Sequence, residues 1–177
     1  MLISRLRTTL TLAVLVGLLL FGVTYGFSAV TEPFPNRAEP PVCTEVAIDQ
    51  GEKIFPEQVT VSVLNAGSRS GLAGRTMGQL ADVGFGRGDA LDAPDGTEVR
   101  RVEIWTDEPN NPDVRLVATY LGSDPPIVRR DTVAVGVNVV VGDRFDELRK
   151  GRKGFKAKQD TSICSPPVVP VLEDPAL

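Results

Sequence analysis

Apolar and polar residues alternate along three stretches of the chain, at 59–64, 99–106 and 133–142. Valine or isoleucine recurs at every second position in the regular part of each stretch, which is typical of a strand with one buried face. A further short strand is expected at 85–93, where the turn-forming sequence Ala-Pro-Asp-Gly follows at 93–96. The pattern therefore predicts four strands.

Two other stretches place apolar residues at the spacing of an amphipathic helix. The first lies between Ser70, which can cap a helix, and Gly84, which suits a left-handed C-terminal cap. The second begins at Asn111-Pro112, a cap followed by proline at the first helical position, and ends at Gly122. The predicted apolar stripes are Leu72, Ala73, Met77, Leu80 and Ala81 in the first helix and Val114, Val117, Ala118 and Leu121 in the second.

The predicted order is strand, helix, strand, strand, helix, strand, which is the split β-α-β pattern of ferredoxin-like sandwiches. The expected fold class is α+β, a small two-layer sandwich with both helices on one face of a largely antiparallel sheet. Val102 and Ile104 are expected to face the core, while Arg101, Glu103 and Trp105 face away from it. The second sheet face is then left to solvent, to a tail or to a ligand.

The first thirty residues have the pattern of a membrane anchor. No charged residue occurs between Leu10 and Val30, and this length is close to the roughly 20 residues that a helix needs to cross the hydrocarbon core. Arg5 and Arg7 precede the run and Glu32 follows it, so the N-terminus is expected in the cytoplasm and the remaining chain outside. A cleaved signal peptide is the alternative, although its apolar core is usually shorter, about 7–15 residues.

The layout predicts four regions. Residues 1–30 are the cytoplasmic N-terminus and transmembrane anchor, 31–58 a proline-containing extracytoplasmic spacer with Cys43, 59–148 the folded domain, and 149–177 a basic and then proline-rich tail with Cys164.

Composition excludes several function classes. The 177-residue chain has a net charge of −4, which argues against nucleic acid as a partner because duplex binding needs a dense basic surface. It contains no histidine, the commonest general base and metal ligand, and no catalytic residue, metal site or cofactor is expected. Cys43 and Cys164 are expected to form a disulfide outside the membrane, with free thiols or links to another chain as the alternatives.

Candidate ligand-binding residues lie in three places. Asn65 and Arg69 belong to a small-residue turn before a helix N-terminus, where backbone amides favour the phosphate or carboxylate of a wall polymer. Trp105 could stack on a sugar beside Arg101, or it packs under the spacer or tail because large apolar groups are usually covered. The basic run at 149–158 is expected to be a solvated connector, with attraction to anionic lipids or wall polymers as the functional alternative.

The stretch from the first strand through the first helix resembles the LytR C-terminal domain family. That family is typified by a valine-rich strand, an asparagine, a small-residue turn, Gly-Leu-Ala and a helix that ends at Leu-x-x-x-Gly-Phe. The sequence VNVVVGDRF at 137–145 also resembles the final strand and turn of that domain. The residues that carry the first match are Val61, Val63, Asn65, Gly71, Leu72, Ala73, Leu80, Gly84 and Phe85.

An anchor, a cysteine-bearing spacer and one such domain are together similar to actinobacterial cell envelope integrity proteins. The resemblance implies a non-enzymatic role at the cell membrane, in which the extracytoplasmic domain binds cell-wall components or wall-assembly proteins. The implied partners are a cell-wall glycopolymer or a LytR-CpsA-Psr-type ligase, which attaches glycopolymers to peptidoglycan. The alternative function is an enzyme or enzyme subunit acting on envelope glycopolymers.

Overall fold

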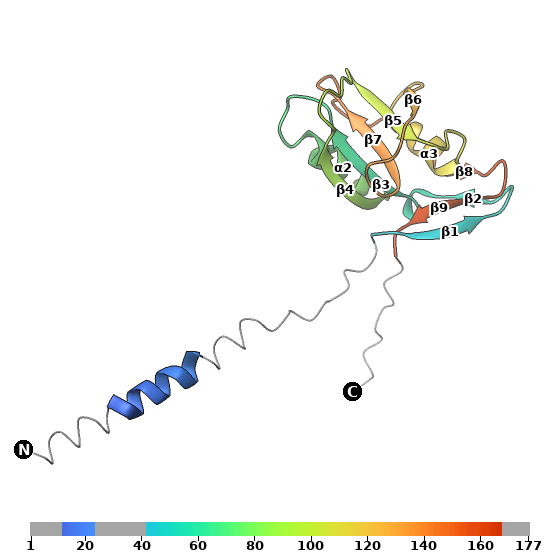
Figure 1. Cartoon of the computed structure of the whole chain (residues 1–177). Coiled ribbons are helices and arrows are strands. Elements are labelled where there is room, and N and C mark those ends of the chain that lie inside the picture. The colour runs from blue at the N-terminus through green and yellow to red at the C-terminus, as the bar shows by residue number, and fades with distance from the viewer. Residues whose placement is uncertain (1–11, 24–41, 168–177) are drawn as a thin grey trace, which may run out of the picture. The chain divides into compact units, whose positions relative to one another are not determined.

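A computed structural model describes residues 12–23 and 42–167, which belong to two separate units (Figure 1). Residues 12–23 form a helix, drawn in blue, whose leucine, valine and phenylalanine side chains are 50–67% exposed. Within the two described ranges, no helix combines the length and the apolar character needed to cross a bilayer. The ends of the expected anchor at 10–30 lie outside the described residues.

The second unit contains a five-stranded sheet in the order β4-β3-β7-β5-β6. Its strands are β3 (Thr60–Asn65), β4 (Gly86–Asp92), β5 (Val102–Thr106), β6 (Ile127–Arg129) and β7 (Val137–Val141). Helix α2 (Leu72–Asp82) connects β3 to β4, and helix α3 (Pro112–Ala118) connects β5 to β6. The four strands and two helices expected from the sequence are confirmed, and the connector at 123–130 ends in the short edge strand β6, which is also consistent with its sequence.

The ferredoxin-like, largely antiparallel arrangement is wrong. β3 pairs in parallel with both β4 and β7, β5 pairs in parallel with β6, and within this sheet only β5 and β7 are antiparallel. Each helix therefore belongs to a β-α-β unit whose two strands are direct neighbours, and β7 joins the two units by lying between β3 and β5. Alternation of apolar residues identifies strands but not their neighbours, so the sequence pattern does not distinguish the two arrangements.

Both helices pack against the same face of the sheet. α2 contacts β3 and β4, whereas α3 contacts β5 and β7. Val102 and Ile104 face this core, as predicted. Burial of the apolar surface, at roughly 25 cal/mol per Å², holds the helices to the sheet. The residues of this core include Val61, Val63, Val102, Ile104, Val137, Val139 and Val141 from the strands and Leu72, Met77, Leu80, Val114, Leu116 and Val117 from the helices.

The opposite face is covered by the connection from β6 to β7. Asn138 Oδ1 on β7 accepts hydrogen bonds from the backbone N–H groups of Val133 and Ala134, at 3.2 and 3.0 Å. Its Nδ2 donates to the Ala134 carbonyl oxygen at 2.7 Å, and Ser62 Oγ on β3 donates to the Val135 carbonyl oxygen at 2.6 Å. These bonds satisfy side chains that are buried in the sheet, where an unpaired polar group would cost about 1–3 kcal/mol.

Two antiparallel strand pairs close the second unit. β1 (Thr44–Ile48) pairs with β9 (Thr161–Ser165), and β2 (Lys53–Ile54) pairs with β8 (Phe155–Lys156). A 3-10 turn, η1 (Pro56–Gln58), leads from β2 to β3. The expected disulfide is confirmed between Cys43 and Cys164, whose Cα atoms are 5.4 Å apart. Parts of the regions assigned to the spacer and the tail are therefore strands of the folded unit.

Replacing both cysteines, Cys43→Ser together with Cys164→Ser, is expected to lower the free energy of unfolding by about 2–4 kcal/mol. The bond joins residues 121 positions apart, so its loss frees a long loop of the unfolded chain. Urea unfolding of the variant and of the oxidised wild-type chain measures the change. Wild-type chain in reductant is the control and should unfold like the variant. Equal stability of the oxidised wild type and the variant would contradict this role of the bond.

Candidate functional site

The strand β3 ends at Asn65, whose side chain organises the turn into α2. Asn65 Oδ1 accepts a hydrogen bond from the Gly67 N–H at 3.0 Å, and Asn65 Nδ2 donates to the Arg69 carbonyl oxygen at 3.2 Å. The N-cap of α2 is Gly71, with a φ of +72°, and not the predicted Ser70. Glycine fits this position because other residues rarely adopt a left-handed backbone.

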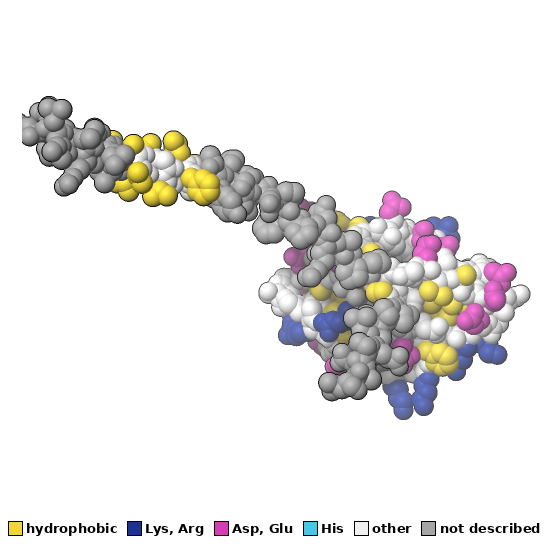
Figure 2. Space-filling view, turned by 90° about the horizontal axis from the view of Figure 1, so that it is seen from below, with side chains coloured by type: hydrophobic (Ala, Val, Ile, Leu, Met, Phe, Trp, Pro, Cys, Tyr) yellow, Lys and Arg dark blue, Asp and Glu magenta, His cyan; other side chains and the backbone are white. Residues whose placement is uncertain are grey.

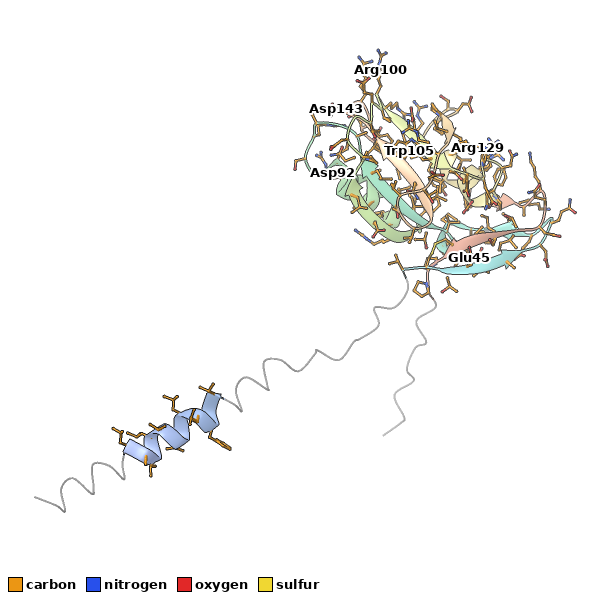
Figure 3. All side chains as sticks on the ribbon, in the orientation of Figure 1. Glu45, Asp92, Arg100, Trp105, Arg129 and Asp143 are labelled. Atoms are coloured by element: carbon orange, nitrogen blue, oxygen red, sulfur yellow. A yellow bond between two sulfur atoms is a disulfide. The ribbon has the colours of Figure 1, made fainter. Side chains whose placement is uncertain are left out.

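The backbone amides of this turn bind a carboxylate of the chain itself. Asp143 Oδ1 accepts hydrogen bonds from the N–H groups of Ser68 at 2.8 Å and Arg69 at 3.3 Å. Gly67 permits this approach, since a Cβ there would lie 2.5 Å from Asp143 Oδ1. Figure 3 shows Asp143 and Asp92 at the same end of the sheet. The amides predicted to attract an anion are therefore already paired within the fold.

The guanidinium of Arg69 is also paired inside the protein. Its Nη2 donates to the Phe145 carbonyl oxygen, and its Nη1 lies 3.6 Å from Asp146 Oδ1. A depression of about 590 Å³ lies between this turn and the end of β4. Ligand binding by Asn65 and Arg69, which lie together here, stays a prediction, and an anion would have to displace Asp143 to reach the turn amides.

Asp143→Ala is expected to lower the free energy of unfolding by about 1–3 kcal/mol, because two backbone amides of the turn lose their charged acceptor. The matched control is Asp146→Ala, whose side chain is 80% exposed, so that its ion pair with Arg69 is worth only about 0–1 kcal/mol. Chemical unfolding of both variants gives the comparison. Equal losses in the two variants would show that Asp143 does not hold the turn.

Trp105 and Arg101, the second predicted pair, are directed to opposite sides of the sheet. Trp105 is only 2% exposed; its Nε1 donates to Glu103 Oε2 at 3.2 Å, and the guanidinium carbon of Arg130 lies 4.6 Å from the ring centre. Arg101 instead donates to the Leu121 carbonyl oxygen at 2.8 Å, on the helix side. The prediction that Arg101 faces away from the core is wrong because this residue precedes β5, where strand alternation does not apply. Stacking of a sugar on Trp105 stays a prediction that would require Arg130 to move.

The basic run at 149–158 is bound to the C-terminal turn of α3. The Arg149 N–H donates to the Tyr120 carbonyl oxygen at 2.7 Å. The Arg152 N–H donates to Thr119 Oγ1 at 3.0 Å, and the Arg152 carbonyl accepts a bond from Tyr120 Oη at 2.9 Å. We call residues 149–158 the basic strap. Because hydrogen bonds fix its backbone, its side chains extend from defined positions, unlike those of the solvated connector that was expected.

A cleft of about 440 Å³ lies between α3 and the basic strap. Arg115 from α3 and Arg152 and Lys158 from the strap line it. The ion pair Arg69–Asp146 is the only one between described residues, so these three cations have no carboxylate partner within the described chain. The charge run in the sequence indicates the strap, but a single arginine within a helix gives no sign that Arg115 faces it.

Asp113, in the first turn of α3, is a buried carboxylic acid. Asp113 is only 7% exposed, and its Oδ1 accepts a hydrogen bond from the Val114 N–H at 2.6 Å. Burial raises the pKa of Asp113 from its ordinary 3.8 to about 6; the Val114 hydrogen bond opposes the shift and the charge of Glu108 adds to it. The adjoining cavity of about 160 Å³ is smaller than ligand pockets, which span roughly 300–1,000 Å³. We therefore expect Asp113 to affect the stability of the fold and not to bind a ligand.

The free energy of unfolding is expected to fall as the pH rises from about 4 to about 6, by up to about 3 kcal/mol. In this range the folded chain keeps the Asp113 proton and the unfolded chain releases it, because the folded pKa is about 6. Asp113→Asn retains an oxygen acceptor for Val114 and should remove this part of the pH dependence. Urea unfolding across the range tests this, and identical slopes for the variant and the wild type would contradict it.

Comparison with known proteins identifies the family of the sheet and its two helices. The family model LytR_C, described as LytR cell envelope-related transcriptional attenuator, matches residues 58–145. Through this segment the chain belongs to the LytR_C family. The matched LytR_C segment includes β3 to β7 with α2 and α3, whereas the terminal strands and the basic strap lie outside it.

One solved structure similar to the chain is the soluble domain of a conserved hypothetical secreted protein, an Rv2700 ortholog, from Mycobacterium marinum. It is 24% identical, with a TM-score of 0.45, and the match covers 57% of this chain and 77% of that one. A search of the curated proteins finds no match.

The LytR_C description names a cell envelope-related attenuator and no catalytic activity. The described residues contain no group of three or more His, Cys, Asp or Glu side chains that could hold a metal ion. What the arrangement offers chemically is a cleft lined by cations and a turn closed by its own carboxylate. The first of these is suited to binding an anion.

Proposed function

We propose that this protein is a non-enzymatic envelope protein whose exported LytR_C domain binds cell-wall components or wall-assembly proteins and thereby supports envelope integrity. The family match supports a role at the cell envelope. The Cys43–Cys164 disulfide supports export, since such bonds persist in oxidising compartments and are rare in the cytosol. The absence of histidine from the 177-residue sequence favours binding over acid–base catalysis.

In this proposal the N-terminal segment anchors the protein in the cell membrane as a single-pass helix. The apolar helix at 12–23 lies within the uncharged run from Leu10 to Val30, whose length suits a membrane span. Arg5 and Arg7 favour a cytoplasmic N-terminus and an extracytoplasmic domain.

The cleft between α3 and the basic strap is the observation that carries the binding role. Arg115, Arg152 and Lys158 line it without an ion-pair partner among the described residues. Like charges gathered at one place are destabilising unless an anion neutralises them. A wall polymer with phosphate or carboxylate groups supplies such an anion.

The full chain in detergent is expected to co-sediment with isolated cell-wall sacculi. The bound fraction should fall when salt is raised from about 0.1 M to about 1 M, because the screening length shortens from about 10 Å to about 3 Å. Sacculi stripped of their attached anionic polymers by acid are the control and should bind less chain. A bound fraction that neither salt nor stripping changes would contradict an anionic wall ligand.

Two further readouts separate the alternatives. Release of soluble fragments from the sacculi would indicate an enzyme acting on envelope glycopolymers. Crosslinking in cells to a LytR-CpsA-Psr-type protein, without binding to sacculi, would favour the wall-assembly partner over the wall itself.

A further inference from the structure

We propose that the cleft between α3 and the basic strap binds a phosphorylated saccharide, with the phosphate held by the cations and the sugar ring against Phe155. This assignment rests on the proposed envelope-binding role and adds the chemical class of the ligand.

The backbone that carries the strap cations is fixed before any ligand binds. A Cβ at Gly151 would overlap the ring of Tyr120, and one at Gly154 would lie 2.6 Å from a carbonyl oxygen of β2. Glycine at these two positions therefore lets the strap lie directly on its neighbours. Gln50 Nε2 donates to the Lys158 carbonyl oxygen at 2.8 Å and holds the far end. A site that is ordered in advance loses less conformational entropy on binding.

The cations of the cleft form no ion pair among the described residues, although Asp124 also lines the cleft. Arg115 uses one N–H for a neighbouring amide oxygen, at 3.1 Å, and its other donors remain for a ligand. In Figure 2, Lys and Arg side chains project from the lower border of the folded unit. A phosphate group can accept several charge-assisted hydrogen bonds from Arg and Lys at once.

The remaining walls of the cleft favour a sugar in addition to the phosphate. Phe155, Pro125 and Ile127 supply an apolar side. The guanidinium carbon of Arg152 lies 5.9 Å from the centre of the Phe155 ring, so a sugar at this ring would lie beside that cation or displace it. Asp124 also lines the cleft without forming an ion pair, so its carboxylate can accept hydrogen bonds from sugar hydroxyls. The volume of about 440 Å³ falls within the range of small-ligand sites, roughly 300–1,000 Å³.

A lipid head group carries the same phosphate chemistry, but no large exposed apolar side chain lines the cleft. The exposed Phe55 lies outside its lining, beneath Lys53. Proteins that lie on membranes present exposed apolar side chains next to their cations. Ile127 and Phe155 are instead partly buried, packed against the main core. The observations therefore favour a saccharide chain that approaches from water.

The test is an NMR titration of the ¹⁵N-labelled full chain in detergent micelles with glucose 1-phosphate, inorganic phosphate and glucose. Glucose 1-phosphate should shift the amides of 115–127 and 149–158 and bind more tightly than inorganic phosphate, while glucose alone causes no saturable shift. Combined Arg115→Glu, Arg152→Glu and Lys158→Glu should weaken binding by about tenfold or more, because the phosphate loses its charged donors.

The matched control combines Arg75→Glu, Arg87→Glu and Arg100→Glu, three exposed arginines outside the cleft, and changes the net charge equally. It should leave the Kd within about twofold, since exposed charges at a distance are screened. Retained amide dispersion and the intact disulfide show that each variant is folded. Equal weakening in both variants would overturn the assignment to the cleft.

Three further comparisons test the saccharide, the lipid alternative and the envelope role separately. Equal affinity for inorganic phosphate and glucose 1-phosphate overturns the saccharide, and shifts that arise only when phosphatidylglycerol is added to the micelles reassign the cleft to a lipid head group. A chain that sediments with sacculi but does not bind glucose 1-phosphate contradicts the cleft assignment alone. A chain that binds glucose 1-phosphate at the cleft but does not sediment with sacculi contradicts the envelope role alone.

Discussion

The pairing of the terminal strands, β1 with β9 and β2 with β8, is the constraint on which the basic strap and the cleft beside α3 depend. The Cys43–Cys164 bond ties the first pair covalently, and Ile48 and Ile163 within it are buried in the main core, with 1% and 2% of their surfaces exposed. The basic strap includes β8, so its bonds to Thr119 and Tyr120 hold its first part and the pairing of β8 with β2 holds its second part. Without the closure, the cleft beside α3 would lose one of its walls.

The turn after β3 and the cleft beside α3 both attract anions, but only the turn is paired with a carboxylate of the chain itself. At the turn after β3, Asp143 supplies the anion that the backbone amides attract, so the electrostatic demand is met within the chain. At the cleft, Arg115, Arg152 and Lys158 face a common space and no described carboxylate pairs with them. A folded protein that keeps such cations together on a fixed backbone retains a surface for an anion from outside. An external anion is therefore expected at the cleft beside the strap and not at the turn after β3.

The sequence identifies most elements, because apolar periodicity reports which face of each strand or helix is buried. It does not identify partners: Val137 to Val141 reads as a strand, but nothing in it shows that β7 lies between β3 and β5. Local alternation also fails at Arg101, which precedes its strand, and the long-range pairing of β9 with β1 leaves no local pattern. The candidate turn residues Asn65 and Arg69 are close in sequence and do lie together. The cleft instead depends on contacts between residues far apart in sequence, such as Tyr120 and Arg152, which are 32 positions apart, and no local pattern reveals them.

The strap, the terminal strands and the disulfide lie outside the segment that matches the LytR_C family. In the structure these parts are nevertheless ordered and bonded to the rest of the folded unit. Amide hydrogen exchange at Arg149, Arg152 and Ala157 tests this directly, since each N–H donates to another element, as for Ala157 to the Glu52 carbonyl oxygen at 2.8 Å. Slow exchange in the oxidised chain and, after reduction, a larger loss of protection at these three amides than in β7 are the predicted result. Exchange at the rate of an unstructured peptide in the oxidised chain would contradict the account.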